Sequence, residues 1–152
     1  MAKYTGTLDI KIKIDESMRE SLDARIQAGQ KYIDWQVIRL SEKYLPYDEG
    51  ILQKSGRDSI IGSGLVTYNT PYARNMYYGK VMVDPITGAA GFMTEDGWRS
   101  RKGVNKVVSD RDYVYQEGPM RGAFWFERMK ADHKDQILKG AAEIMRKGGS
   151  ET

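Results

Sequence analysis

Hydrophobic and charged residues alternate strictly near the beginning of the chain. From Leu8 to Asp15, every even position is apolar and every odd position is charged. A period of two places alternate side chains on opposite faces of an extended chain. We therefore expect a strand over residues 8–15 with one buried face. Asp15 and Ser17 follow as candidate N-caps of a helix.

The next apolar positions follow a helical period instead. They recur every three, four or seven residues and predict one long helix over about residues 17–44. Gly29 interrupts this stripe, which indicates a kink or a close contact at that position. Pro46 ends the helix, because proline cannot continue the ladder of hydrogen bonds. The stripe consists of Met18, Leu22, Ile26, Ile33, Val37, Leu40 and Tyr44.

The middle of the chain predicts shorter elements. Residues 51–55 indicate at least one helical turn. Apolar and β-branched residues over Ser59–Ile61 and Leu65–Tyr68 predict two strands, and Gly62-Ser63-Gly64 between them is a hairpin-turn signal. We therefore expect a small hairpin in this part of the chain.

Two further helices are predicted towards the C-terminus. Thr70 as the cap and Pro71 at the first helical position begin a short helix that ends at Gly79. The last helix covers about residues 124–147, and Gly148 stops it. Its apolar stripe consists of Phe126, Met129, His133, Ile137, Ala141 and Ile144.

Residues 80–118 are the least regular part of the sequence. Val81–Val83 and Tyr113–Tyr115 predict strand pieces, with a long loop or an extended hairpin between them. The predicted fold class is therefore α+β. A small, mostly antiparallel sheet would be packed by the long N-terminal helix and the C-terminal helix. We expect one domain over residues 1–147 and a flexible tail over residues 148–152.

The composition limits the chemistry that this chain can perform. The 152 residues include no cysteine, which excludes disulfides and thiolate catalysis, and 24 basic against 21 acidic residues give a net charge of only +3. No run of 18 apolar residues predicts a membrane span. Ten tyrosines, three tryptophans and eight methionines exceed what the two helical stripes need. Such residues either fill the core or form interaction surfaces.

No group of residues in the sequence forms a convincing catalytic site. His133 is the sole histidine and lies on an apolar stripe, which favours a hydrogen-bonded residue at the edge of the core over an acid–base or metal role. Asp48, Glu49 and Asp58 flank a turn, where carboxylates are common for local reasons. Gly62-Ser63-Gly64 lacks the pattern of a phosphate-binding loop. We therefore expect no enzymatic activity, no metal and no cofactor.

Two groups of residues are candidates for interaction. Three consecutive aromatic residues, Phe124–Phe126, cannot all face one core from a helix, so at least one should contact the long loop or a neighbouring subunit. Trp125 and Phe126 are the expected anchors of the last helix. The long loop also carries basic residues beside a tryptophan, which would suit a contact with a subunit or with DNA: Trp98, Arg99, Arg101, Lys102 and Lys106.

The order of these elements resembles the minor capsid and head–tail joining proteins of siphophages, relatives of the tail-completion proteins. Residues 46–55 match a P-x-D-x-G-x-L-x-x-S motif, and residues 72–79 match Y-A-x-x-x-x-x-G. An aromatic-led helix from Phe124 follows, as in that family. Tyr77-Tyr78-Gly79 stands where the family has V-E-x-G. The motif positions that we expect to shape the turn and the short helix are Pro46, Asp48, Gly50, Tyr72, Ala73 and Gly79.

This resemblance implies a structural subunit of the phage neck. Members form rings, usually hexameric, between the head connector and the tail terminator or tail tube, and double-stranded DNA passes through the lumen. The expected location is the virion, after assembly in the cytoplasm of the bacterial host. The basic loop would then line the lumen or contact the next ring.

Two alternatives remain from the sequence. A small basic nucleic-acid-binding module would use the cations of the long loop and would lose affinity as salt rises. A metal-dependent hydrolase would use Asp48, Glu49 and His133.

Overall fold

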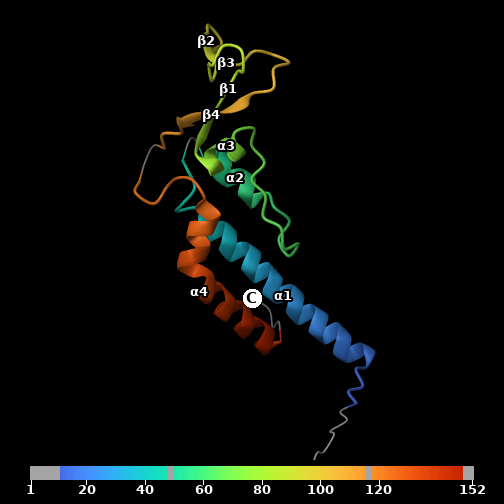
Figure 1. Ribbon diagram of the computed structural model, residues 1–152. Helices are drawn as coiled ribbons and strands as arrows, with labels where there is room; N and C mark the ends of the chain where they lie inside the picture. The colour runs from blue at the N-terminus through green and yellow to red at the C-terminus, as the bar shows by residue number, and fades with distance from the viewer. Residues whose placement is uncertain (1–10, 48–49, 116–117, 149–152) are drawn as a thin grey trace, which may run out of the picture.

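The computed structural model of the chain describes residues 11–47, 50–115 and 118–148 (Figure 1). Its helices are α1 (Glu16–Ser41), α2 (Ile51–Arg57), α3 (Ala73–Tyr78) and α4 (Trp125–Lys147). Its strands are β1 (Lys80–Val83), β2 (Phe92–Thr94), β3 (Gly97–Arg99) and β4 (Val107–Asp112). The predicted α+β class is confirmed, with two long helices and small antiparallel sheets.

The long helix α1 begins and ends for local reasons. The Asp15 carboxylate accepts the Met18 amide at 2.8 Å, and Glu16 places a negative charge in the first turn. After Ser41 the chain leaves the helix, and the amides of Tyr44 and Leu45 donate to the Ser41 carbonyl. The helix predicted over residues 17–44 is confirmed, although it ends three residues earlier than expected.

Helix α4 runs back along α1, and two glycines allow the close approach (Figure 1). A Cβ added to Gly29 of α1 would lie 2.1 Å from the end of Met145. A Cβ added to Gly140 of α4 would lie 2.2 Å from the Tyr32 hydroxyl oxygen. The close contact predicted at Gly29 is therefore confirmed. The main buried cluster lies where the first turns of α4 meet the end of α1, α2 and α3, and it includes Leu40, Tyr44, Leu45, Leu52, Ala73, Met76, Trp125 and Met129.

The strands form an arm, residues 80–112, which extends from the helices (Figure 1). Strand β1 pairs antiparallel with β4 through an irregular register, and β2 pairs antiparallel with β3. Gly79 ends α3 with a φ of 70°, and its carbonyl accepts the Tyr113 amide at 2.9 Å where the chain returns. Helix α3 contacts β1, whereas α1 and α4 pack mainly on each other. The long helices therefore form a body, and the sheets stand apart from it.

The strand predicted over residues 8–15 is not formed where the structure describes it. Residues 11–15 have no regular secondary structure and are exposed, and residues 8–10 lie outside the described part of the chain. The predicted hairpin over Ser59–Tyr68 is also wrong. Its first half is a series of turns. Its second half, Leu65–Tyr68, has no regular secondary structure and no partner strand among the described residues, and Figure 1 draws it as an extended chain.

Two smaller boundaries differ from the expectation. The short helix begins at Ala73, two residues after Pro71, with Tyr72 at its N-cap. Strand β4 ends at Asp112, so Tyr113–Tyr115 does not form the predicted strand piece. Tyr113 and Tyr115 instead pack against the core of the body, and the Tyr115 hydroxyl donates to the Met76 carbonyl.

In the described ranges, none of the helices combines the length and the hydropathy that crossing a bilayer requires.

Candidate functional site

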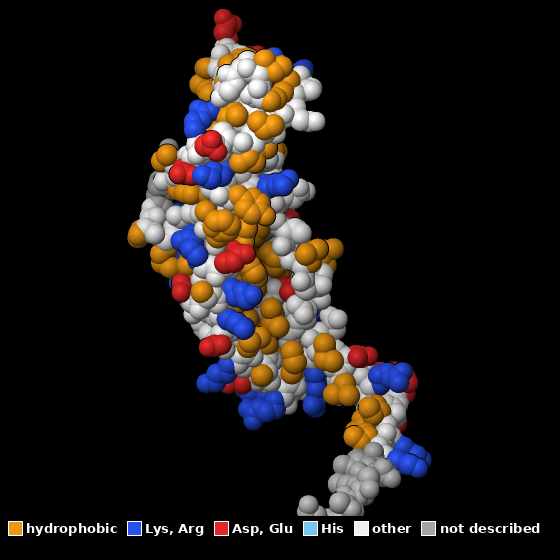
Figure 2. All heavy atoms as spheres, viewed as in Figure 1, with side chains coloured by type: hydrophobic (Ala, Val, Ile, Leu, Met, Phe, Trp, Pro, Cys, Tyr) orange, Lys and Arg blue, Asp and Glu red, His pale blue; other side chains and the backbone are white. Residues whose placement is uncertain are grey.

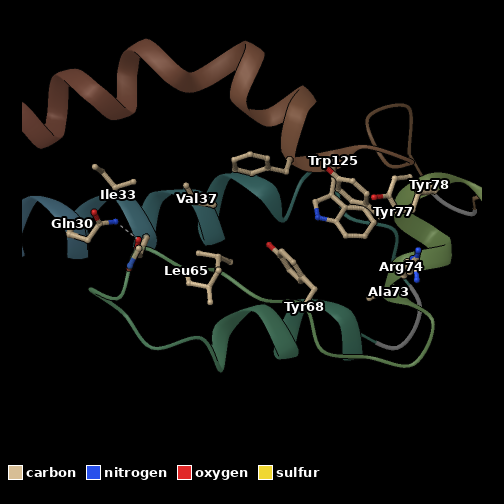
Figure 3. A pocket seen from close by; sticks show the side chains of 14 residues that line it. Gln30, Ile33, Val37, Leu65, Tyr68, Ala73, Arg74, Tyr77, Tyr78 and Trp125 are labelled. Carbon is tan, nitrogen blue, oxygen red and sulfur yellow. Dashed lines mark hydrogen bonds between the residues drawn. The ribbon is translucent and has the colours of Figure 1, made fainter.

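A groove of about 610 Å³ opens on the body between α1, the extended chain that follows Gly64, α3 and the first turn of α4 (Figure 3). Aliphatic and aromatic side chains line most of it. The lining residues from α1 are Gln30, Ile33, Asp34 and Val37; those from the extended chain are Gly64, Leu65, Val66 and Tyr68; those from α3 and α4 are Ala73, Arg74, Tyr77, Tyr78, Trp125 and Phe126.

A buried aspartate holds one wall of this groove in place. Asp34 is 3% exposed, and its Oδ2 accepts the amides of Gly62 and Gly64 at 2.7 and 3.1 Å. Its Oδ1 accepts the Gln30 side-chain amide at 2.7 Å (Figure 3). The carboxylate is therefore fully engaged in tying the Gly62–Gly64 turn to α1. This anchoring explains why the turn does not form a hairpin.

Aromatic rings form the other end of the groove. Tyr77 and Tyr68 each meet the buried Trp125 ring edge to face, at centroid distances of 4.7 and 5.7 Å. Burial raises the pKa of Tyr68 to about 12. Burial, together with the hydrogen bond that Tyr77 donates to Glu127, raises the pKa of Tyr77. Both phenols are therefore neutral at physiological pH, and this wall is suited to packing rather than to proton transfer.

The first half of α1 carries an apolar stripe that nothing in the described chain covers. Met18, Leu22 and Ile26 are 52%, 46% and 56% exposed. Gly148, which ends α4, lies against the Arg25 guanidinium, so residues 16–24 extend past the end of α4. At about 1.5 Å per residue this projecting end is about 13 Å long. The periodicity of the stripe was predicted correctly, but its first half faces solvent.

The arm carries a second exposed apolar surface at the opposite end of the molecule. Figure 2 shows hydrophobic side chains gathered at the tip of the arm and on the projecting end of α1. Met93 and Trp98 are 71% and 59% exposed, on two paired strands. Exposed apolar patches of this kind usually mark interaction sites. The other large hydrophobic side chains that are exposed on the arm are Ile86, Phe92, Val107 and Val108.

Two of the four basic residues predicted to meet DNA or a neighbour are engaged inside the arm. Arg101 forms an ion pair with Asp84 at 3.0 Å, and the Lys106 ammonium donates to the Ala90 carbonyl. The amides of Ile86 and Thr87, together with the nearby cations, hold the pKa of Asp84 below its ordinary value. Arg99 and Lys102 are exposed, as is Trp98. The arm therefore offers fewer free cations than its sequence suggests.

The motif residues of the first turn are brought together at the end of α1. Pro46 is buried, and its carbonyl accepts the Gln53 side-chain amide at 3.1 Å. Gly50 adopts a φ of 71° just before α2, a conformation that favours glycine. Asp48 lies outside the described residues. The Arg121 guanidinium donates to the Leu45 carbonyl at 2.6 Å and fixes this turn to the segment that precedes α4.

The motif residues of the second element border α3. Tyr72 and Gly79 cap its two ends, and Ala73 is buried beneath the groove. Tyr72, Ala73 and Gly79 therefore lie at α3, and not among the basic residues of the arm. Their expected role in shaping the turn and the short helix stays a prediction.

The three consecutive aromatic residues differ in exposure: Trp125 and Phe126 belong to α4, and Phe124 is the N-cap that precedes it. Trp125 is 2% exposed, whereas Phe124 and Phe126 are 45% and 39% exposed. Phe124 adopts a φ of 50°, a strained conformation for a residue with a side chain, and its amide donates to the Tyr77 carbonyl at 2.9 Å. Its ring packs edge to face on Tyr77 and Tyr78.

His133 lies at the edge of the core, as the sequence predicted. Its Nε2 is 3.3 Å from the Tyr44 hydroxyl, and its Nδ1 is 3.3 Å from the Gln136 side-chain oxygen. The Tyr44 hydroxyl donates to Asp132 at 2.5 Å, and this bond together with burial raises the pKa of Tyr44. Among the described residues, no three histidines, aspartates or glutamates are grouped to bind a metal.

Sequence reasoning missed the polar residues that organise the site. Asp34 interrupts the apolar face of α1 between Ile33 and Val37, and a charged residue at a core position is the signal that could have revealed it. Arg121 and Arg128 reach the carbonyls at the end of α1, and Arg128 also lies over the Tyr44 ring. No local pattern indicates those contacts, because about 80 positions separate the partners along the chain.

Exposed apolar side chains at both ends of the subunit are typical of a structural protein, one that works through contacts with other proteins. Among the described residues none are grouped as a metal site, Tyr68 and Tyr77 of the groove are neutral packing groups, and apolar side chains are exposed at both ends. The family model for the minor capsid protein matches residues 8–143, and the chain belongs to this family. It is thus a phage minor capsid protein, a component of the virion and not an enzyme. A search of curated proteins and a search of solved structures each found no match.

Proposed function

We propose that this minor capsid protein is a head–tail joining subunit of the phage neck. Copies of the single domain, residues 1–147, assemble into a ring, most simply a hexamer. One face of the ring docks on the head connector, and the other face receives the tail terminator or tail tube. Double-stranded DNA passes through the lumen. The protein acts by stacking and sealing, without chemistry of its own.

The observation that carries this proposal is the presence of two different apolar surfaces at opposite ends of an elongated subunit. One is the stripe on the projecting end of α1, and the other is the tip of the arm (Figures 1 and 2). A ring is built from head-to-tail contacts, which require two unlike surfaces on each subunit. A dimer with two-fold symmetry would need only one self-complementary surface. Membership of the minor capsid family supports a partner within the virion.

The experiment that tests this function is complementation of a phage that lacks the gene. Loss of the protein should leave DNA-filled heads and free tails that do not join, and electron microscopy of the lysate measures this directly. The wild-type chain should restore joined particles. If heads and tails join normally without the protein, the proposed function is wrong.

A matched pair of variants ties the function to the α1 stripe. Leu22→Glu places a charge on the exposed stripe and should fail to restore joined particles, because a charge cannot be buried in an apolar contact without a large cost. Ser21→Glu adds the same charge one position earlier on exposed α1 and should restore them. Light scattering of both purified chains shows whether the stripe also supports a ring in solution. Equal activity of the two variants would contradict a role for the stripe.

A further inference from the structure

The extended chain that borders the groove has one unused edge. Leu65 donates its amide to the Ser63 hydroxyl at 3.2 Å, and Thr67 exchanges hydrogen bonds with the Ser59 hydroxyl at 3.0 and 3.3 Å. The main-chain groups of Val66 and Tyr68 have no hydrogen bond within the described residues. In an extended chain, the main-chain groups of successive residues point to opposite edges. The open edge is therefore the one that Val66 and Tyr68 share.

This edge has the geometry that accepts an added strand. Both Val66 and Tyr68 line the groove, so a strand paired with them would lie along its apolar wall. Unpaired edges next to apolar pockets bind extended peptides by main-chain hydrogen bonds, while alternate side chains enter the pockets. The sequence of Leu65–Tyr68 predicted a strand, and the described part of this chain offers it no partner.

A segment with the complementary pattern precedes α1 in the chain. Residues 8–15 alternate apolar and charged side chains, so one face of an extended chain would be apolar and the other charged. Ile12 and Ile14, which the structure describes, are 76% and 54% exposed and belong to no strand. An apolar strand face that faces water gains stability only when something covers it.

The segment of one chain is too far from its own groove to fill it. Gln30 is the first α1 residue that lines the groove, and it lies about 22 Å along the helix from Asp15. Val37, near the middle of the groove, lies about 33 Å away. Residues 8–14 span at most about 24 Å when fully extended. If the segment folded back, its isoleucines would cover the α1 stripe and would not reach the centre of the groove.

We infer that residues 8–14 of one copy dock as an added strand in the groove of the next copy, against Val66 and Tyr68. The isoleucines enter the apolar groove, and the charged residues at odd positions stay in water. Because the donor segment and the acceptor groove are different parts of the subunit, each copy can give one strand and receive one. The contact is therefore head-to-tail and can close a ring. The inference rests on the proposed ring, for which it names the contact between neighbours.

Cysteine trapping tests this contact cleanly, because the chain has no cysteine of its own. Ile12→Cys and Leu65→Cys are both exposed positions, 76% and 64%, so neither change disturbs the core. The two single variants, carrying tags of different mass, are mixed and oxidised. We expect a disulfide-linked dimer of the two chains, several-fold more abundant than the dimer formed when Ile86→Cys replaces Leu65→Cys. Ile86 is at least as accessible, at 78% against 64% for Leu65, but lies on the arm.

A chain that carries both Ile12→Cys and Leu65→Cys separates the two possible sources of the strand. Linked dimers and larger rings support donation between copies. A bridged monomer would show that the segment fills its own groove and would overturn the inference. The inference would also be overturned if Leu65→Cys gave no more disulfide-linked dimer with Ile12→Cys than the Ile86→Cys control gives.

A second pair of variants measures the consequence for assembly. Ile12→Glu should lower the fraction of ring in light scattering and in phage complementation, because it places a charge on the inserted face. Lys13→Glu changes the outward face and should have little effect. If a chain without residues 2–14 still restores joined heads and tails, the strand inference is wrong and the neck function stands. If the phage needs no copy of the protein at all, the proposed function is wrong whatever the cross-links show.

Discussion

Removal of the Asp34 carboxylate is the most direct test of how the groove is held open. In Asp34→Ala, the amides of Gly62 and Gly64 lose their acceptor, and the Gln30 side chain loses its partner. The helix itself should tolerate the change, because alanine is the strongest helix former. The effect should therefore fall on the turn and on the wall that follows it.

The size of the effect follows from the number and kind of bonds that are lost. A hydrogen bond to a charged group contributes about 1.5–3 kcal/mol, so two main-chain donors give roughly 3–6 kcal/mol as an upper bound. Gly62 is only half-buried and Gly64 is exposed, so water replaces part of this when the turn opens. We expect the free energy of unfolding to fall by about 2–4 kcal/mol.

Urea titration followed by circular dichroism measures this loss, and amide hydrogen exchange locates it. The exchange of Gly62 and Gly64 should speed up far more than that of amides in the middle of α4. Asp23→Ala is the matched control, because Asp23 is an exposed residue of the same helix. It should change the free energy of unfolding by less than about 0.5 kcal/mol. If Asp34→Ala and Asp23→Ala were equally mild, the anchoring role of Asp34 would be wrong.

Three further outcomes are expected. Gly140→Ala should lower the free energy of unfolding by about 1–3 kcal/mol, because the new Cβ meets the Tyr32 ring. Gly29→Ala meets only the flexible end of a methionine and should cost less than about 1 kcal/mol. Urea titrations in which Gly29→Ala were the more destabilising change would refute this. Tyr68 alone should make the free energy of unfolding fall by about 2 kcal/mol as the pH rises from 10 to 12, because the folded chain keeps the Tyr68 proton longer than the unfolded chain does. In alkaline urea titrations Tyr68→Phe should reduce the slope by this amount, while the raised pKa values of Tyr44 and Tyr77 leave a residual slope, and an unchanged slope would refute the assignment. The lowered pKa of Asp84 predicts that the arm loses stability as the pH falls below 3.8. In Asp84→Asn, tryptophan fluorescence should no longer show this loss on acidification. If the acid transition of Asp84→Asn were the same as that of the wild type, the result would count against the ion pair.

The helices could be predicted from the sequence because their signals are local and long. A repeated apolar stripe and clear end signals placed both long helices within three residues of the observed bounds. The same stripe could not show that Met18 and Ile26 face solvent, since periodicity identifies an apolar face but not what covers it. That answer depends on where α4 ends, at Gly148, which is a property of the packed body.

The strands and the groove were harder to predict because they depend on distant partners. The Gly62–Gly64 turn has a hairpin sequence, but Asp34 takes its amides, 28 and 30 positions earlier in the chain. Strand β4, with the sequence VVSDRD, is exposed on both faces and lacks the alternation that identifies a half-buried strand. The tyrosines after it have the stronger strand propensity, yet their rings are needed in the core of the body.

The junction of the arm has a mechanical consequence for a subunit that must fit between unlike neighbours. The chain enters the arm after Gly79 and leaves it at Tyr113, and α3 also contacts β1. Among the described residues, one main-chain hydrogen bond, from the Tyr113 amide to the Gly79 carbonyl, joins the two crossings. A strand of six residues is about 20 Å long, so a rotation of about 10° at this junction carries the tip by about 3–4 Å. We expect a small rotation at this junction to let the tip of the arm reach contact points whose spacing differs from that of the helices.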